Sequence, residues 1–219
     1  MGAGMERAAT VAGAAKDGSL AAAAAASSAR LDEVDLLRAR EYALLATLLG
    51  SPPTPDLLSR LATLDGDASR LGRVHGVLAA AARQAAHAAV EREYFELFVG
   101  VARGELLPYA SYYLTGFLNE RPLALVREAL ASLCIERSEE NPEPEDHIAT
   151  LCEVMAGLAS GDFPADAATQ RRFFERHLQP WAGDFFANLE SARAARFYSA
   201  VGALGRVLVE IEAEALTME

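Results

Sequence analysis

The chain has 219 residues, of which 52% are hydrophobic and 23% are charged, and this composition excludes a chain that is disordered as a whole. Its 31 acidic residues outnumber its 20 basic ones and give a formal net charge of −11, which disfavours nucleic acids and anionic membranes as partners and favours basic peptides. Two cysteines exclude a disulfide framework, and no apolar run reaches the ~20 residues that span a bilayer, so we predict a soluble protein of the reducing cytoplasm without stable membrane insertion.

The first thirty residues are rich in alanine and need separate treatment. The alanine run at 21–26 is only weakly hydrophobic, follows Asp17, and has no basic cluster directly before it, so it does not match a secretory signal. We predict a flexible N-terminal tail over 1–30 and one all-helical domain over 31–219.

Apolar residues at three- and four-residue spacings predict a first helix from Leu31 to Gly50. Its predicted buried face consists of Val34, Leu37, Leu44, Leu45 and Leu48. Thr54 can cap a second helix that begins at Pro55, where a missing amide hydrogen costs nothing. We expect this second helix to run to the turn at 65–67.

The middle of the chain predicts further helices with less certain boundaries. The stretch 68–98 is rich in alanine and indicates one or two helices, with Gly72 and Gly76 as candidate interruptions. Glycine and proline mark a connection over 100–108, and another helix is predicted over 122–133.

The last third of the chain begins with a polar run over 138–145, which predicts a loop. We expect a helix to begin within this run, at Asn141 or Pro142, and to end at Gly161. Two or three more amphipathic helices follow, and no stretch shows sustained strand alternation. The predicted fold class is therefore all-α, an irregular single-domain bundle of about eight to eleven helices. Such a fold argues against the architectures that usually bind nucleotides.

Residues that carry chemistry are few: four histidines, two cysteines and no HExxH, GxSxG, P-loop or GxGxxG motif. The most suggestive group is the run Glu143-Pro144-Glu145-Asp146-His147, with Cys152 five residues further on. A five-residue spacing points His147 and Cys152 to different helix faces, and no third ligand is spaced to help, so we predict no metal site. Proline and acidic residues also suit the first turn of a helix, which makes helix capping the alternative interpretation.

Aromatic residues gather in two places. Those within 94–98 fall at helical spacing, which is typical of a core and less often of a binding surface. Three tyrosines follow Pro108, and phenols favour half-buried sites where the ring packs and the hydroxyl stays wet. These tyrosines are Tyr109, Tyr112 and Tyr113. Such a surface suits peptide capture.

Three blocks of the sequence carry a resemblance to a known family. They are Tyr94-x-x-Leu97-Phe98-x-Gly100, Gly104-Glu105-Leu106-Leu107-Pro108-Tyr109-Ala110-Ser111-Tyr112-Tyr113-Leu114 and Glu143-Pro144-x-Asp146-His147. In order and separation they resemble the TorD-like redox-enzyme maturation chaperones, which include the DmsD and NarJ branches. The third block matches the E-P-x-D-H signature of that family completely. The likeness covers about Leu31 to Ile211 and leaves the tail outside it.

The resemblance implies an all-helical, non-catalytic chaperone that uses no cofactor. It would bind the twin-arginine leader, or a nearby region, of a molybdenum-containing oxidoreductase subunit and hold it for cofactor loading before export. The middle block is most similar to relatives associated with formate dehydrogenase. The leader-binding residues that the resemblance implies are Glu143, Pro144, Asp146, His147, Tyr94, Leu97, Phe98, Pro108 and Tyr109. Some relatives carry tryptophan in place of Tyr94 and Tyr109, which indicates a groove tuned to another leader.

Arginine prefers carboxylates and an apolar segment prefers an aromatic groove, so we expect Asp146, with Glu143 nearby, to meet the basic end of the leader. The competing hypothesis is a metal- or nucleotide-dependent helical enzyme that uses His147 as general base or ligand. A helical transcription regulator is disfavoured by the acidic charge, and we predict no nucleic-acid partner. The oligomeric state is left open between a monomer and a helix-swapped dimer.

Overall fold

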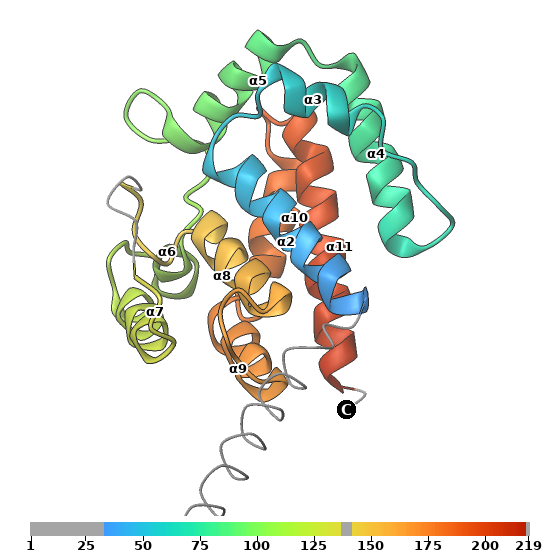
Figure 1. Ribbon diagram of the computed structural model, residues 1–219. Coiled ribbons are helices and arrows are strands. Elements are labelled where there is room, and N and C mark those ends of the chain that lie inside the picture. The colour runs from blue at the N-terminus through green and yellow to red at the C-terminus, as the bar shows by residue number, and fades with distance from the viewer. Residues whose placement is uncertain (1–32, 137–141, 218–219) are drawn as a thin grey trace, which may run out of the picture.

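The structure is a computed structural model that describes residues 33–136 and 142–217, so the tail predicted over 1–30 lies outside the described residues. Over these ranges the chain forms ten α-helices, one π-helical turn and no strand, which confirms the predicted all-α fold (Figure 1). The helices are α2 (Glu33–Gly50), α3 (Pro55–Leu61), α4 (Arg70–Gln84), α5 (His87–Tyr94), the π-helical turn η1 (Phe95–Val99), α6 (Ala110–Thr115), α7 (Arg121–Ser132), α8 (Ile148–Ser160), α9 (Ala167–His177), α10 (Ala182–Ser191) and α11 (Phe197–Thr217). None of these helices is long and apolar enough to cross a membrane.

For α2 the predicted end at Gly50 is confirmed and the predicted start at Leu31 lies outside the described residues, but two of the five residues predicted for its buried face are wrong. Val34 and Leu37 are exposed. The buried residues of this helix are Ala39, Tyr42, Leu45, Leu48 and Leu49. The first turns are instead held by Arg38, whose Nε and Nη2 donate to the two carboxylate oxygens of Glu212 on α11 at 2.7 and 2.8 Å. A bidentate ion pair thus replaces part of the expected apolar stripe.

The predicted cap of α3 is confirmed. The hydroxyl of Thr54 accepts a hydrogen bond from the backbone N–H of Leu57 at 3.2 Å, and Pro55 is the first helical residue. The helix ends at Leu61, earlier than the turn at 65–67 where the sequence placed its end.

The alanine-rich stretch forms two helices, as predicted, but glycine does not divide them. Gly72 and Gly76 both lie within α4, and the break comes between Gln84 and His87. A side chain at position 72 would overlap Asp67, so glycine lets the preceding turn pack directly on the helix. The glycine marks a close approach of two backbone segments rather than a helix end.

The start of α8 corrects the sequence prediction. The helix begins at Ile148, with His147 as its N-cap, and not at Asn141 or Pro142. Asn141 lies outside the described residues, and Pro142 precedes the helix. Gly161 ends α8 with a φ of 78°, as predicted. The signature residues therefore lie before the helix rather than in its first turn, which excludes simple capping by Glu143 and Pro144.

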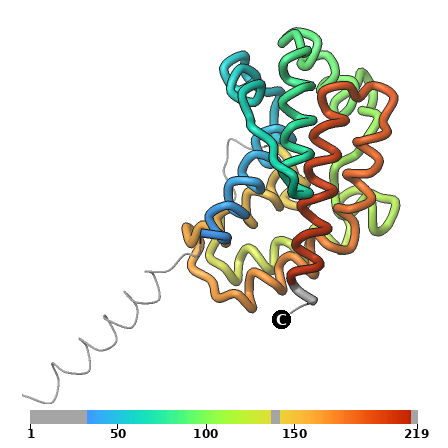
Figure 2. The backbone as a smooth tube through the Cα atoms, turned by 90° about the vertical axis from the view of Figure 1, so that its right-hand side faces the viewer, coloured from blue at the N-terminus to red at the C-terminus, as the bar shows by residue number. Residues whose placement is uncertain are grey.

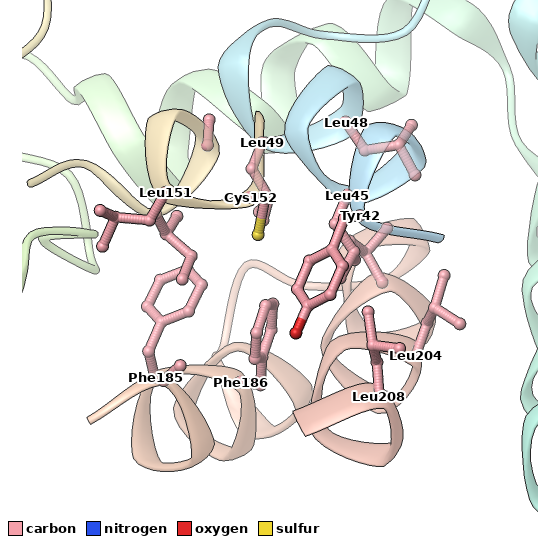
Figure 3. Close-up of a cluster of buried hydrophobic side chains, with 14 of the residues drawn as sticks. Tyr42, Leu45, Leu48, Leu49, Leu151, Cys152, Phe185, Phe186, Leu204 and Leu208 are labelled. Carbon is pink, nitrogen blue, oxygen red and sulfur yellow. The ribbon is translucent and has the colours of Figure 1, made fainter. Parts of the chain in front are cut away.

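The core lies among α2, α8, α10 and α11, and in Figure 2 α11 runs beside both α4 and α10. Figure 3 shows side chains from the four helices converging: Tyr42, Leu45, Leu48, Leu49, Leu151, Cys152, Phe185, Phe186, Leu204 and Leu208. Cys152 is buried here, and burial raises the pKa of its thiol. Its sulfur lies within this hydrophobic core.

A buried glutamate joins α5 to the start of α11. The carboxylate of Glu93 accepts hydrogen bonds from the backbone N–H groups of Arg196, Phe197 and Tyr198 at 2.7, 3.1 and 2.7 Å. These are N–H groups that the first turn of a helix cannot satisfy internally. The contact fixes the end of α5, which leads into the Tyr94 block, against the longest helix of the bundle.

Candidate client-binding site

The second and third sequence blocks pair through their backbones. Tyr109 and His147 form an isolated antiparallel bridge. On either side of it, the N–H of Ala110 donates to the carbonyl of Asp146 at 3.0 Å, and the N–H of Ile148 donates to the carbonyl of Pro108 at 2.9 Å. The segment Pro142–His147, which we call the signature segment, is thereby fixed beside α6 although about 35 residues separate the two in sequence.

Asp146 makes the most buried polar contact of this segment. Its side chain is 1% exposed, and Oδ2 accepts a hydrogen bond from the N–H of Ser111 at 2.8 Å. Ser111 lies in the first turn of α6, so the carboxylate caps that helix from a distant segment. The other oxygen, Oδ1, has no hydrogen-bond partner within the described residues. The carboxylate therefore holds α6 in place through one of its two oxygens.

His147 is a buried, neutral N-cap. Its Nδ1 accepts a hydrogen bond from the N–H of Ala149 at 3.1 Å, and its ring lies 5.1 Å from that of Tyr109. Burial lowers the pKa of His147 to about 4, against the opposing influence of Glu143 and Asp146. The imidazole thus uses one nitrogen to begin α8. Within the described ranges no three His, Cys, Asp or Glu side chains are placed to hold a metal ion.

Glu143 connects the signature segment to both aromatic blocks. The Tyr109 hydroxyl donates to Glu143 Oε2 at 2.5 Å, and burial together with this carboxylate raises the pKa of Tyr109. Burial, aided by Glu143, also raises the pKa of Tyr94 to about 12. The negative charge of Glu143 therefore disfavours ionisation of both phenols. One residue from each sequence block meets at this point.

Beside this cluster lies a hollow of about 490 Å³, which we call the acidic hollow. Its lining residues are Ala46, Gly50, Leu130, Ile135, Glu136, Pro142, Glu143, Glu145, His147, Ala149, Thr150, Glu153, Val154 and Phe163. Among the residues that the structure describes, the lining includes four glutamates and no lysine or arginine, and most of the other lining residues are apolar. A hollow lined by both acidic and apolar side chains complements a segment that is both basic and apolar.

The predicted residues divide into those that reach this hollow and those that support it. Glu143 and His147 line the hollow, and Pro144 lies between them in the segment. Tyr94 and Phe98 are half-buried and pack edge to face, with ring centroids 5.1 Å apart. Leu97 is fully buried, and Pro108 contributes its carbonyl to the backbone pairing described above.

Sequence reasoning missed three of the four acids of the hollow, Glu136, Glu145 and Glu153. Glu145 occupies the variable position of the E-P-x-D-H signature, so the motif gives it no role. Glu153 lies on α8 one turn beyond Ala149, which also lines the hollow. Glu136 lies in the segment that follows α7 and could be found only from the fold.

Comparisons with known proteins agree with the sequence blocks. The sequence profile of the nitrate reductase delta subunit family matches residues 64–187. The chaperone protein TorD of Shewanella loihica is 25% identical over 202 residues, which cover 82% of this chain and 92% of that protein. The TorD chaperone of Vibrio cholerae is 29% identical over 137 residues, covering 58% of this chain and 62% of its own.

A solved structure shows the same fold. The crystal structure of a protein described as a redox enzyme maturation protein from Archaeoglobus fulgidus superposes with a TM-score of 0.53 at 20% identity. The superposition covers 79% of this chain and 93% of the other.

Proposed function

This chain belongs to the nitrate reductase delta subunit family, the family of the TorD-like chaperones, and on that premise we propose that it is a cytoplasmic chaperone for a molybdenum-containing oxidoreductase subunit. It binds the twin-arginine leader of that subunit, or a region near it, and catalyses no reaction. The subunit is held until its cofactor is loaded, and formate dehydrogenase is the client that the middle sequence block favours.

The observation that carries this proposal is the composition of the acidic hollow. Four glutamates line it together with several aliphatic side chains and Phe163. A twin-arginine leader presents two guanidinium groups followed by an apolar stretch. Arginine binds carboxylates through charge-assisted hydrogen bonds, and the apolar stretch gains free energy by leaving water. The basic and the apolar part of such a leader match the acidic and the apolar side chains that line the hollow.

Within this proposal the signature residues have separate tasks. Glu143 lines the hollow and contacts the leader, whereas Asp146, although expected from the sequence to meet an arginine, is buried against Ser111. Asp146 and His147 are therefore positioning residues, because they fix α6 and begin α8. Tyr109 donates to Glu143 and Tyr94 packs on Phe98, but these aromatic residues are not among the residues that line the hollow, so we assign them a supporting role.

The test uses isothermal titration with a synthetic peptide that carries an Arg-Arg pair followed by an apolar stretch, and the same peptide with Gln-Gln. Loss of a buried partner of an arginine costs about 2 to 5 kcal/mol, so we expect Glu143→Gln to weaken binding of the Arg-Arg peptide by more than about tenfold.

The matched control is Glu96→Gln, which removes one negative charge from an exposed position outside the hollow. It should leave the affinity nearly unchanged. Equal binding of both peptides by the wild-type chain, or equal effects of the two substitutions, would contradict the proposal.

A further inference from the structure

Glu145 already has a cationic partner from within the chain. Arg127 of α7 contacts it with Nε and Nη2, each at 2.9 Å, and both contacts converge on the same carboxylate oxygen, Oε2. The side chain of Glu145 is 11% exposed, whereas that of Arg127 is 54% exposed. A buried acid is thus neutralised by a cation that remains largely in water.

Glu145 also stands between two hollows. On one side is the acidic hollow, and on the other is a second hollow of about 520 Å³. The residues of the second hollow are Arg127, Leu130, Ala131, Cys134, Ile135, Glu136 and Glu145. Arg127 lines the second hollow and not the acidic hollow. Because Glu145 lines both hollows, a guanidinium that enters the acidic hollow comes within reach of the carboxylate that Arg127 contacts.

The energetics favour an exchange of partners at this carboxylate. A buried carboxylate requires a counter-ion, and leaving it without one is costly. An exposed arginine contributes little by remaining in a pair, because water solvates its guanidinium almost as well. Contacts that meet on a single oxygen also lack the parallel two-oxygen geometry in which arginine binds most strongly. Arg127 can leave at low cost, provided that another cation arrives.

We propose that Arg127 is a resident counter-ion for Glu145 and that an arginine of the client displaces it. This inference rests on the proposed function and assigns Glu145, at the variable position of the signature, to the client-binding set. Because one guanidinium replaces another, the buried carboxylate is paired in both the empty and the loaded chaperone. Arg127 competes with the client and so lowers its affinity, which favours release.

The test compares Arg127→Gln with Arg121→Gln by isothermal titration of the Arg-Arg and Gln-Gln peptides. Arg121 lies on the same helix, is exposed, and lines neither hollow, so its substitution makes the same change in net charge. Removing a competitor of ordinary ion-pair strength should tighten binding of the Arg-Arg peptide roughly three- to tenfold relative to Arg121→Gln. Binding of the Gln-Gln peptide should be unchanged.

A second variant separates competition from a change in structure. In Arg127→Gln/Glu145→Gln the gain should disappear, because the carboxylate for which the two arginines compete is gone. Binding by Arg127→Gln that is equal to or weaker than that of Arg121→Gln would overturn the inference while leaving the proposed function intact. A wild-type chain that does not prefer the Arg-Arg peptide would overturn the proposed function, and this inference with it.

Discussion

Two buried carboxylates hold helix starts in different parts of the molecule, and they do so to different degrees. Glu93 is 7% exposed and accepts three backbone hydrogen bonds at the start of α11, with both oxygens engaged. Asp146 is 1% exposed and accepts one from Ser111 at the start of α6, while Oδ1 has no partner among the described residues.

This difference distinguishes Glu93, which only connects two helices, from Asp146, which lies in the segment that we assign to client binding. At α11 both oxygens of the acid accept hydrogen bonds from the backbone, so this contact stabilises the fold. Near the acidic hollow the signature segment keeps unused acceptor capacity in a buried place, where an unsatisfied polar atom costs free energy. The helical body gives up some stability at the surface that we assign to the client.

The largest effect is expected from Glu93→Gln. Both oxygens of Glu93 accept N–H groups, so either orientation of an amide places an NH₂ group against a backbone donor. We expect a loss of about 3 kcal/mol in the free energy of unfolding, measured by urea denaturation.

The control for this substitution is Glu96→Gln, which is exposed on the following turn. It should change stability by less than about 0.5 kcal/mol. If Glu93→Gln lost no more than this control, α11 would not depend on the cap, and the contrast with Asp146 would fail.

Sequence reasoning predicted the parts of this fold that depend on neighbouring residues. The cap at Thr54, the end of α8 at Gly161 and the extent of α7 follow from local preferences of hydroxyls, glycine and apolar spacing. Gly72 misled because glycine serves equally as a helix breaker and as a point of close backbone approach, and only the position of Asp67 distinguishes the two.

The contacts that form the site join residues distant in the sequence, so local sequence patterns could not predict them. The start of α8 moved to Ile148 because residues 146–148 pair with the backbone of residues 108–110, a contact that no local spacing encodes. The pair of Arg127 with Glu145 joins residues 18 positions apart in different elements. The motif identified where the site lies, and the fold determines which of its acids reach the hollow.

Acid should weaken the signature segment through His147. Its folded pKa is about 4, below the ordinary value of 6.5, so between these values the unfolded chain takes up a proton that the folded chain does not. Stability contributed by the neutral ring is therefore complete above pH 6.5 and is lost as pH falls toward 4. We expect a loss of about 2 kcal/mol over this range.

The variant that isolates this effect is His147→Asn, because asparagine caps helices well and does not titrate. Urea unfolding of both proteins at several pH values between 7 and 4 should show wild-type stability falling more steeply than that of the variant. His87→Asn, at a more exposed position on α5, should keep the wild-type slope. Parallel slopes for wild type and His147→Asn would show that the buried ring is protonated at no cost.

The smallest effect is expected from Asp146→Asn, and it tests the comparison most directly. Unlike glutamine at 93, asparagine at 146 can keep its oxygen toward the N–H of Ser111 and place its NH₂ group where Oδ1 now lies without a donor. We expect a loss of about 1 kcal/mol in the free energy of unfolding, measured by urea denaturation beside Glu93→Gln. Equal losses for the two isosteric changes would mean that Oδ1 is as fully engaged as the oxygens of Glu93. A smaller loss for Asp146→Asn would show that Oδ1 is less engaged than the oxygens of Glu93, as expected for a buried residue that positions α6.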